Sequence, residues 1–117
     1  MDQPIVHFEI IGSDAVRLQR FYSDLFEWTV AQPSGPELGF YGMVGADSSG
    51  FPVGIGLQSG GGVRTTAYVQ VADLQATLDR AVAMGGQVVV PPTEIPGVLT
   101  FAHFADPDGN VLGLVKG

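Results

Sequence analysis

The residues best suited to chemistry lie on two segments that the sequence pattern predicts to be strands. In VHFEI, residues 6–10, His7 and Glu9 are two positions apart and therefore share one face of the strand. In TTAYVQV, residues 65–71, the same spacing places three polar residues on one face: Thr66, Tyr68 and Gln70. An imidazole or a carboxylate can act as a general base near neutral pH, and hydroxyl and amide groups can orient a ligand. A buried Glu9 needs a partner, which we expect to be His7, Tyr68 or Gln70; the alternative is that Glu9 faces solvent in a wide mouth of the cleft.

Further candidates come from a later strand and from glycines within strands. Phe101 and His103 share a face of one predicted strand. Glycine packs no side chain in a strand, yet Gly54 and Gly113 each stand four residues after a turn glycine, and Gly56 follows on the same face. Besides allowing strand curvature, such bare backbone predicts an open floor for a flat or bulky organic ligand. The substitution Gly113→Phe is then expected to block that floor while leaving the fold largely intact.

Composition excludes several classes of function. The chain has 117 residues, of which 45% are hydrophobic and 15% charged, and this is typical of a single globular domain. A net charge of −7 with only five Lys plus Arg disfavours binding to nucleic acid or to an anionic membrane. The absence of cysteine removes disulfides, zinc ribbons and thiol nucleophiles. The N-terminus lacks the layout of a signal peptide and no apolar run could span a bilayer, so we expect a cytoplasmic protein.

The sequence repeats one plan at an offset of 59 residues. Residues 6–26 and 65–85 each read as a strand, an aspartate and an amphipathic helix, and the aspartates Asp14 and Asp73 are placed to cap those helices. The same offset relates the turn that ends at Gly50 to the turn that ends at Gly109, and it relates the strand glycine Gly54 to Gly113. A common offset for strand, helix, turn and glycine indicates an internal repeat.

Each half therefore reads β-α-β-β-β. The predicted buried helix positions are Leu18, Phe21, Tyr22 and Leu25, and Leu74, Leu78, Ala81 and Val82. The strands that follow the helices are expected at about 40–45, 52–58, 87–91, 99–104 and 111–115, with PPTEIPG (91–97) as a proline-stiffened loop. We expect an α+β fold in which two βαβββ modules, about 4–60 and 64–117, form a half-open, curled mixed β-sheet barrel around a cleft.

These segments together resemble the vicinal oxygen chelate superfamily, the group of glyoxalase I, bleomycin-resistance proteins and extradiol dioxygenases. The resemblance rests on VHFEI, RFYSDLFEW, YVQVADLQATLDRAVAMGG, PPTEIPG and FADPDGN, and it covers essentially the whole chain. It implies the paired-module fold just described, as a single domain. Since relatives of this length commonly close their clefts with a second chain, it also implies a homodimer.

In the metal enzymes of this superfamily, the first and last strands of each half supply one ligand each. The resemblance places these four positions at His7, Gly54, Thr66 and Gly113, of which only His7 ligates a divalent metal well. Gln58 shares a face with Gly54 and could add one amide, but zinc, iron or manganese needs at least three protein ligands. We therefore expect no metal and no other cofactor.

Two classes of function remain open. The first is a metal-free small-molecule binding protein of the bleomycin-resistance type, with an organic ligand in a cleft centred on His7, Glu9 and Tyr68. The second is a metal-independent isomerase, lyase or cyclase with Glu9 or His7 as general base. His7 and His103 have the alternative of a core role, as strand histidines bonded to a neighbour. The spacing favours the binding class, because no second catalytic group is well placed. Its ligand-binding candidates are Gly54, Gly56, Gln58, Thr66, Tyr68, Gln70, Phe101, His103 and Gly113.

Overall fold

Strands and helices follow one another largely in the order that the repeat predicts. The computed structural model describes residues 3–31, 41–57 and 62–117. The chain divides into two units, one of His7–Thr65 and the other of Met1–Val6 with Thr66–Gly117. The first six residues thus belong to the same unit as the second half of the chain.

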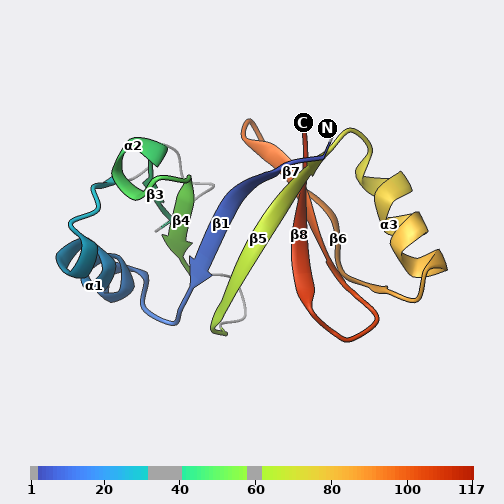
Figure 1. The fold of residues 1–117 in the computed structure, drawn as a ribbon, viewed down its shortest axis with the longest axis horizontal. Coiled ribbons are helices and arrows are strands. Elements are labelled where there is room, and N and C mark those ends of the chain that lie inside the picture. Colours follow the sequence, from blue (N-terminus) through green and yellow to red (C-terminus); the bar gives the residue numbers. More distant parts are fainter. Residues whose placement is uncertain (1–2, 32–40, 58–61) are drawn as a thin grey trace. The chain divides into compact units, whose positions relative to one another are not determined.

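The unit His7–Thr65 is built on a four-stranded sheet (Figure 1). Its elements are β1 (Ile5–Ile11), α1 (Ala15–Phe26), β2 (Val30–Ala31), β3 (Gly42–Val44), α2 (Ala46–Ser49), β4 (Val53–Gly56) and the start of β5 (Arg64–Val71). The strand order is β2-β3-β4-β1, with β4 parallel to β1 and the other neighbours antiparallel. The sequence pattern did not predict β2 or the short helix α2, and residues 40 and 58 of the predicted strands lie outside the described part of the chain.

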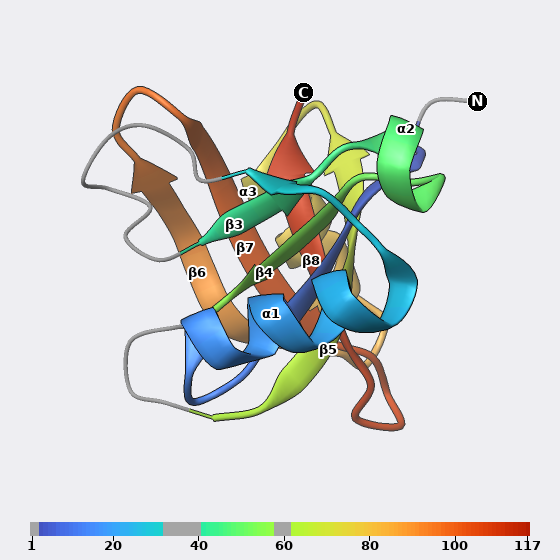
Figure 2. The same cartoon turned by 90° about the vertical axis from the view of Figure 1, so that its left-hand side faces the viewer.

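Helix α1 packs on one face of this sheet, and Figure 2 shows it lying across β4. As predicted, the Asp14 carboxylate caps the helix by accepting a hydrogen bond from the Arg17 backbone N–H at 3.1 Å. Beneath the helix lies an apolar core of sheet residues, against which Leu18 and Tyr22 pack: Ile10, Val44, Val53 and Ile55. Alternation along β1 and β4 therefore directs every second residue into this core.

The predicted buried stripe of α1 is wrong in part. Phe21 and Leu25 are 56% and 58% exposed, whereas the fully buried helix residues are Ala15 and Gln19. The Gln19 side-chain amide donates a hydrogen bond to the backbone carbonyl of Ile55 at 2.7 Å. This polar contact fixes the rotation of the helix about its axis, and the rotation turns the apolar side chains at the far end of the stripe outward.

The second unit contains β5, α3 (Leu74–Ala83), β6 (Gln87–Ile95), β7 (Leu99–Ala105) and β8 (Val111–Lys116). Its strand order is β5-β8-β7-β6, with β5 parallel to β8 and the other neighbours antiparallel. Helix α3 packs on this sheet, and Asp73 caps it as predicted. The core that they share consists of Val71, Leu74, Leu78, Ala102 and Leu114. Val82, which the helix stripe predicted to be buried, is instead 50% exposed.

Strand β6 corrects a second expectation. The segment 91–97 was expected to be a loop, yet the strand continues to Ile95 through two consecutive prolines, Pro91 and Pro92. Proline lacks a backbone N–H and is tolerated in a sheet at an edge or at a bulge. Both conditions hold here, because β6 is the outermost strand and its pairing with β7 shifts register between Val90 and Thr93.

The glycines of the two predicted Asp–Gly turns, Gly50 and Gly109, have backbone conformations suited to a turn. Gly50 has φ 84° and Gly109 has φ 93°, a left-handed conformation that favours glycine. Among the described residues, no helix is both long enough and apolar enough to cross a membrane.

Candidate functional site

A polar network lies on the face of β1 opposite the core of the unit His7–Thr65. Phe8 and Ile10 contribute to the core beneath α1, so alternation places His7 and Glu9 together on the other face, as predicted. Glu9 is only 8% exposed. A carboxylate buried to this extent requires hydrogen-bonding partners.

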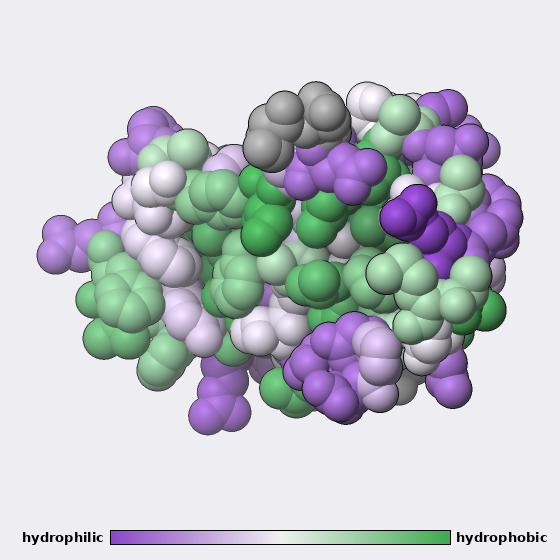
Figure 3. All heavy atoms as spheres, turned by 45° about the vertical axis from the view of Figure 1, so that its right-hand side comes forward, coloured by the Kyte–Doolittle hydropathy of each residue, from purple (hydrophilic) through white to green (hydrophobic). Residues whose placement is uncertain are grey.

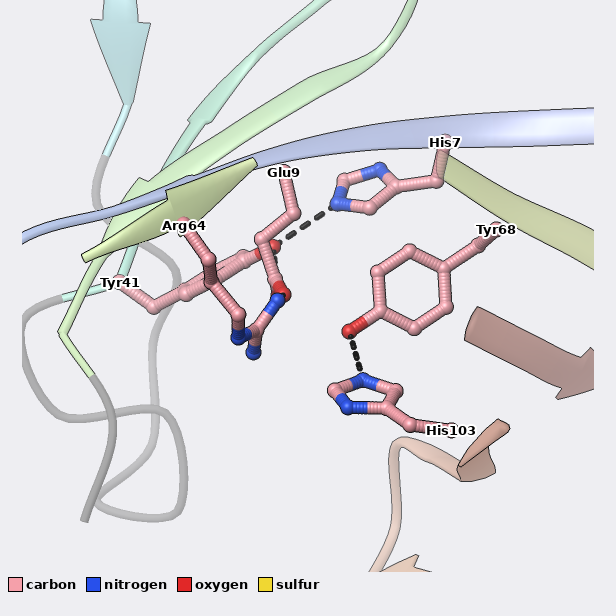
Figure 4. Close-up of polar contacts among 6 residues, drawn as sticks. All are labelled: His7, Glu9, Tyr41, Arg64, Tyr68 and His103. Atoms are coloured by element: carbon pink, nitrogen blue, oxygen red, sulfur yellow. Dashed lines mark hydrogen bonds and ion pairs between the residues drawn. The ribbon is translucent and has the colours of Figure 1, made fainter. Parts of the chain in front are cut away.

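Both oxygens of Glu9 have such partners. Arg64 Nη1 lies 2.8 Å from Oε1 in a salt bridge, and the Tyr41 hydroxyl donates to Oε2 at 2.8 Å. The same hydroxyl lies 2.8 Å from His7 Nε2 (Figure 4). We call these four residues, His7, Glu9, Tyr41 and Arg64, the Glu9 network. Neither Tyr41 nor Arg64 was among the partners that the sequence suggested for Glu9.

The proton count assigns the tautomer of His7. A tyrosine hydroxyl has one proton, which Tyr41 donates to Glu9 in this arrangement. His7 Nε2 must then carry a proton and donate it to the Tyr41 oxygen. The pKa of His7 is lowered from its ordinary value, chiefly because burial disfavours the charged imidazolium, and the negative charge of Glu9 opposes this only in part. His7 is therefore a neutral imidazole at pH 7, with its other nitrogen, Nδ1, unprotonated.

This lowered pKa predicts a pH dependence of folding. Because the unfolded chain binds the His7 proton more readily than the folded chain, the free energy of unfolding should decrease as the pH falls below about 6.5. Urea denaturation between pH 7.5 and 5 should show this decrease, and His7→Gln should show a smaller one. An equal decrease in wild type and His7→Gln would contradict the assignment, and His103→Gln is the matched control.

The Tyr41 ring explains two of the strand glycines. A Cβ atom on Gly54 would overlap the Tyr41 hydroxyl and ring, and a Cβ on Gly56 would lie 2.7 Å from Tyr41 Cδ1. The register places Gly54 directly between Glu9 on β1 and Met43 on β3. The glycines therefore do not leave an open floor as expected, because the Tyr41 ring crosses this backbone to reach Glu9.

The second unit contains a similar arrangement. Tyr68 on β5, Gly113 on β8 and His103 on β7 are direct neighbours across three strands. The Tyr68 ring crosses Gly113, where any Cβ would overlap it, and its hydroxyl lies 2.7 Å from His103 Nε2. Tyr68 and His103 are both buried, and the Phe101 ring lies 5.5 Å from the imidazole of His103.

Each unit therefore places a tyrosine ring over a strand glycine and directs its hydroxyl to a histidine. The glycines Gly54 and Gly113 correspond under the repeat offset of 59, but the tyrosines do not, since the offset leads from Tyr41 to Thr100. The two arrangements thus share a geometry without sharing the strand positions that supply it.

The remaining candidates have the following places. Thr66, which is buried, and Gln70 lie on the same face of β5 as Tyr68, as alternation predicts. Gln58 lies outside the described residues. Neither Tyr41 nor Arg64 was predicted from the sequence. The pair of glycines two apart on β4 was the available signal for Tyr41, because bare backbone on one face leaves room for an aromatic ring.

The four positions that correspond to metal ligands do not fit a divalent metal. Two are glycines whose space is taken by tyrosine rings, one is Thr66, and His7 Nε2 contacts the Tyr41 hydroxyl. Within the described residues, no group of three or more His, Cys, Asp or Glu side chains is placed to hold a metal ion.

Fold and site together define a domain of the glyoxalase type. Residues 8–115 match the model of the Glyoxalase-like domain, so the chain belongs to that family. A crystal structure of a glyoxalase/bleomycin resistance protein/dioxygenase superfamily member from Vibrio splendidus 12B01 is similar over 98% of this chain and 99% of its own, with a TM-score of 0.62 and 17% identity. The family match confirms the resemblance predicted from the sequence, and the structural similarity confirms the α+β fold class.

Two curated relatives are similar in sequence. CFP32 of Mycobacterium tuberculosis (strain CDC 1551 / Oshkosh) is 43% identical over 49 residues, which cover 42% of this chain and 19% of CFP32. The anthracycline biosynthesis protein DnrV of Streptomyces peucetius is 29% identical over an alignment of 117 positions that covers 87% of this chain and 42% of DnrV. The chain thus spans less than half the length of these relatives.

Proposed function

We propose that this glyoxalase-like domain is a metal-free small-molecule binding protein that holds an organic ligand at the Glu9 network. The observation that carries the proposal is the position of Tyr41. Its ring covers Gly54, and its hydroxyl lies between His7 and Glu9. In the metal enzymes that the chain resembles, the strand positions of His7 and Gly54 supply metal ligands. In this protein the Tyr41 side chain lies at both positions. This arrangement supports recognition of a ligand by hydrogen bonds and ring contacts in place of metal coordination.

The state of Glu9 favours binding over catalysis. A general base must have an oxygen available to a substrate proton in a suitable pose. The two oxygens of Glu9 instead accept from Arg64 and Tyr41 at 2.8 Å each. Glu9 is therefore better suited to orienting a hydroxyl group than to removing a proton.

One observation favours the alternative, a metal-independent isomerase, lyase or cyclase. His7 is neutral at pH 7, which is the form that a general base requires, so His7 is the candidate base of such an enzyme. The substitution His7→Gln separates the two functions. A binding protein would keep its ligand with a modest loss of affinity, whereas an enzyme would bind its substrate but lose about 10²–10⁴-fold in rate.

A thermal-shift screen with and without a chelator tests the proposed function. The panel should include anthracyclines, because DnrV is named for their biosynthesis. At 100 times its dissociation constant, a ligand of the native state adds about 2.7 kcal/mol to the free energy of unfolding. We expect at least one organic compound to raise the melting temperature equally in the presence and absence of EDTA. Elemental analysis showing about one Zn, Fe, Mn or Ni per chain, with binding lost on its removal, would refute the proposal.

We also propose that the chain forms a homodimer. Apolar side chains reach its surface: Figure 3 shows hydrophobic groups among hydrophilic ones on the face drawn there, and Phe21, Leu25 and Phe26 of α1 are each more than half exposed. Apolar surface of this kind is stabilised when a second copy covers it. Light scattering should give twice the monomer mass of 12.3 kDa. A monomer mass at every concentration tested would contradict this.

A further inference from the structure

We propose that the Glu9 network is a binding site for a phenolic ring, which Tyr41 occupies in the free protein, and that a hydroxyaromatic ligand binds by replacing the Tyr41 side chain. The inference rests on the proposed function and names the ligand chemistry of that same site. The Tyr41 side chain, which fits the site, indicates the chemical group that the site accepts.

The polar atoms of the site match a phenol hydroxyl. Such a hydroxyl donates one hydrogen bond and accepts others. Glu9 Oε2 accepts from the Tyr41 oxygen at 2.8 Å, and His7 Nε2 donates to it at 2.8 Å. Arg64 lies 2.8 Å from the other Glu9 oxygen, so Oε2 remains the atom that accepts this proton. An aryl ether in the same place would have no proton for Glu9, and a plain aromatic hydrocarbon would satisfy neither neighbour.

The floor of the site matches a flat ring. The Tyr41 ring lies on the backbone of β4 at Gly54 and Gly56, two residues on one face of the strand with no side chain between them and the ring. A ligand ring could therefore make the same floor contacts without moving any side chain of β4. Aliphatic alcohols offer the hydroxyl without the flat ring, so they would lose this surface.

The position of Tyr41 in the fold allows a ligand to replace its side chain. Tyr41 precedes β3 and lies outside the ladder of that strand. It is half-buried, and it is absent from the apolar core beneath α1, which consists of Ile10, Val44, Val53, Ile55 and the side chains packed against them. Replacing its ring therefore leaves that core intact. When Tyr41 leaves, its hydrogen bonds to His7 and Glu9 are lost. A ligand that forms the same hydrogen bonds offsets most of this loss of free energy.

The test uses p-cresol, which is the tyrosine side chain with its Cβ as a methyl group, and measures its dissociation constant by calorimetry. Removing the built-in ring removes the competition for the site, because apparent affinity scales with the fraction of protein in the competent state. We expect p-cresol to bind Tyr41→Gly at least tenfold more tightly than wild type. Tyr41→Phe keeps the ring but loses the hydroxyl contacts, so it should give an intermediate affinity.

Two related compounds test the role of the hydroxyl. In Tyr41→Gly, 4-methylanisole and toluene should each bind at least tenfold more weakly than p-cresol, because a hydrogen bond to a charged group is worth about 1.5–3 kcal/mol, or roughly 10–100-fold. Adding Glu9→Gln to Tyr41→Gly should reduce this preference. If Tyr41→Gly does not fold, the comparison of Tyr41→Phe with wild type serves the same purpose.

Equal affinity of wild type and the Tyr41 variants for p-cresol would overturn the inference, and so would toluene binding as tightly as p-cresol. If the panel yields organic ligands that bind without metal while p-cresol does not bind, the phenolic assignment falls and the proposed function stands. Because the two experiments use different compounds, their failures can be told apart.

Discussion

Gly113→Phe is expected to lower the free energy of unfolding by more than about 3 kcal/mol, rather than to block a ligand in an otherwise intact fold. The sequence suggested an open floor at this position, but the Tyr68 ring crosses Gly113 and any Cβ there would overlap it. Tyr68 and His103 are each only 4% exposed, so the ring has little room to move. Overpacking a buried site typically costs about 1–3 kcal/mol even for small additions. Chemical denaturation should show the loss.

A double-mutant cycle isolates the cause. Gly113→Ala should cost about 1–3 kcal/mol in wild type, because its single methyl group already overlaps the Tyr68 ring. In a Tyr68→Ala background the same substitution should cost much less, since the ring is gone. Equal costs in both backgrounds would mean that Gly113 is required for its backbone alone. Gly54→Ala, measured with and without Tyr41→Ala, is the corresponding cycle in the other unit.

The second large effect is expected at Arg64. Replacing Arg64 with Met should lower the free energy of unfolding by about 2–3 kcal/mol, because the Glu9 carboxylate would lose its charge partner while remaining buried. Adding Glu9→Gln to Arg64→Met should recover part of this loss, since the amide carries no charge. Urea midpoints at constant m-value provide the measurement.

The exposures of the two side chains make this a sharp test. The Arg64 side chain is 24% exposed and that of Glu9 only 11%, so the pair lies between a surface pair and a fully buried one. Exposed salt bridges typically contribute less than about 1 kcal/mol. A loss below about 0.5 kcal/mol in Arg64→Met would therefore show that solvent stabilises the Glu9 carboxylate without its partner.

Features set by local sequence were predicted well. The helix caps at Asp14 and Asp73 and the left-handed turn glycines depend on residues within one turn of each other. The shared face of His7 and Glu9 follows from strand alternation alone. These interactions need no knowledge of the rest of the chain.

Features set by distant residues were missed. Tyr41 meets His7 across 34 positions of sequence, and Arg64 meets Glu9 across 55. No local pattern specifies which ring will cover a strand glycine or which cation will pair with a buried carboxylate. The buried face of α1 was predicted only in part, since Gln19 is buried and donates to the Ile55 carbonyl while Phe21 and Leu25 are exposed. Tertiary contacts of this kind override helix periodicity.

The two prolines of β6 also bear on how the protein behaves at high concentration. An outer strand whose backbone donors are exposed can recruit further chains and seed cross-β fibrils. Pro91 and Pro92 remove two consecutive donors from the middle of β6, and the register shift beside them distorts the strand further. Apolar side chains of this strand, Val88 and Val89, are exposed just before them. We therefore expect the two prolines to act as gatekeepers that hinder an apolar outer strand from becoming a template for amyloid growth.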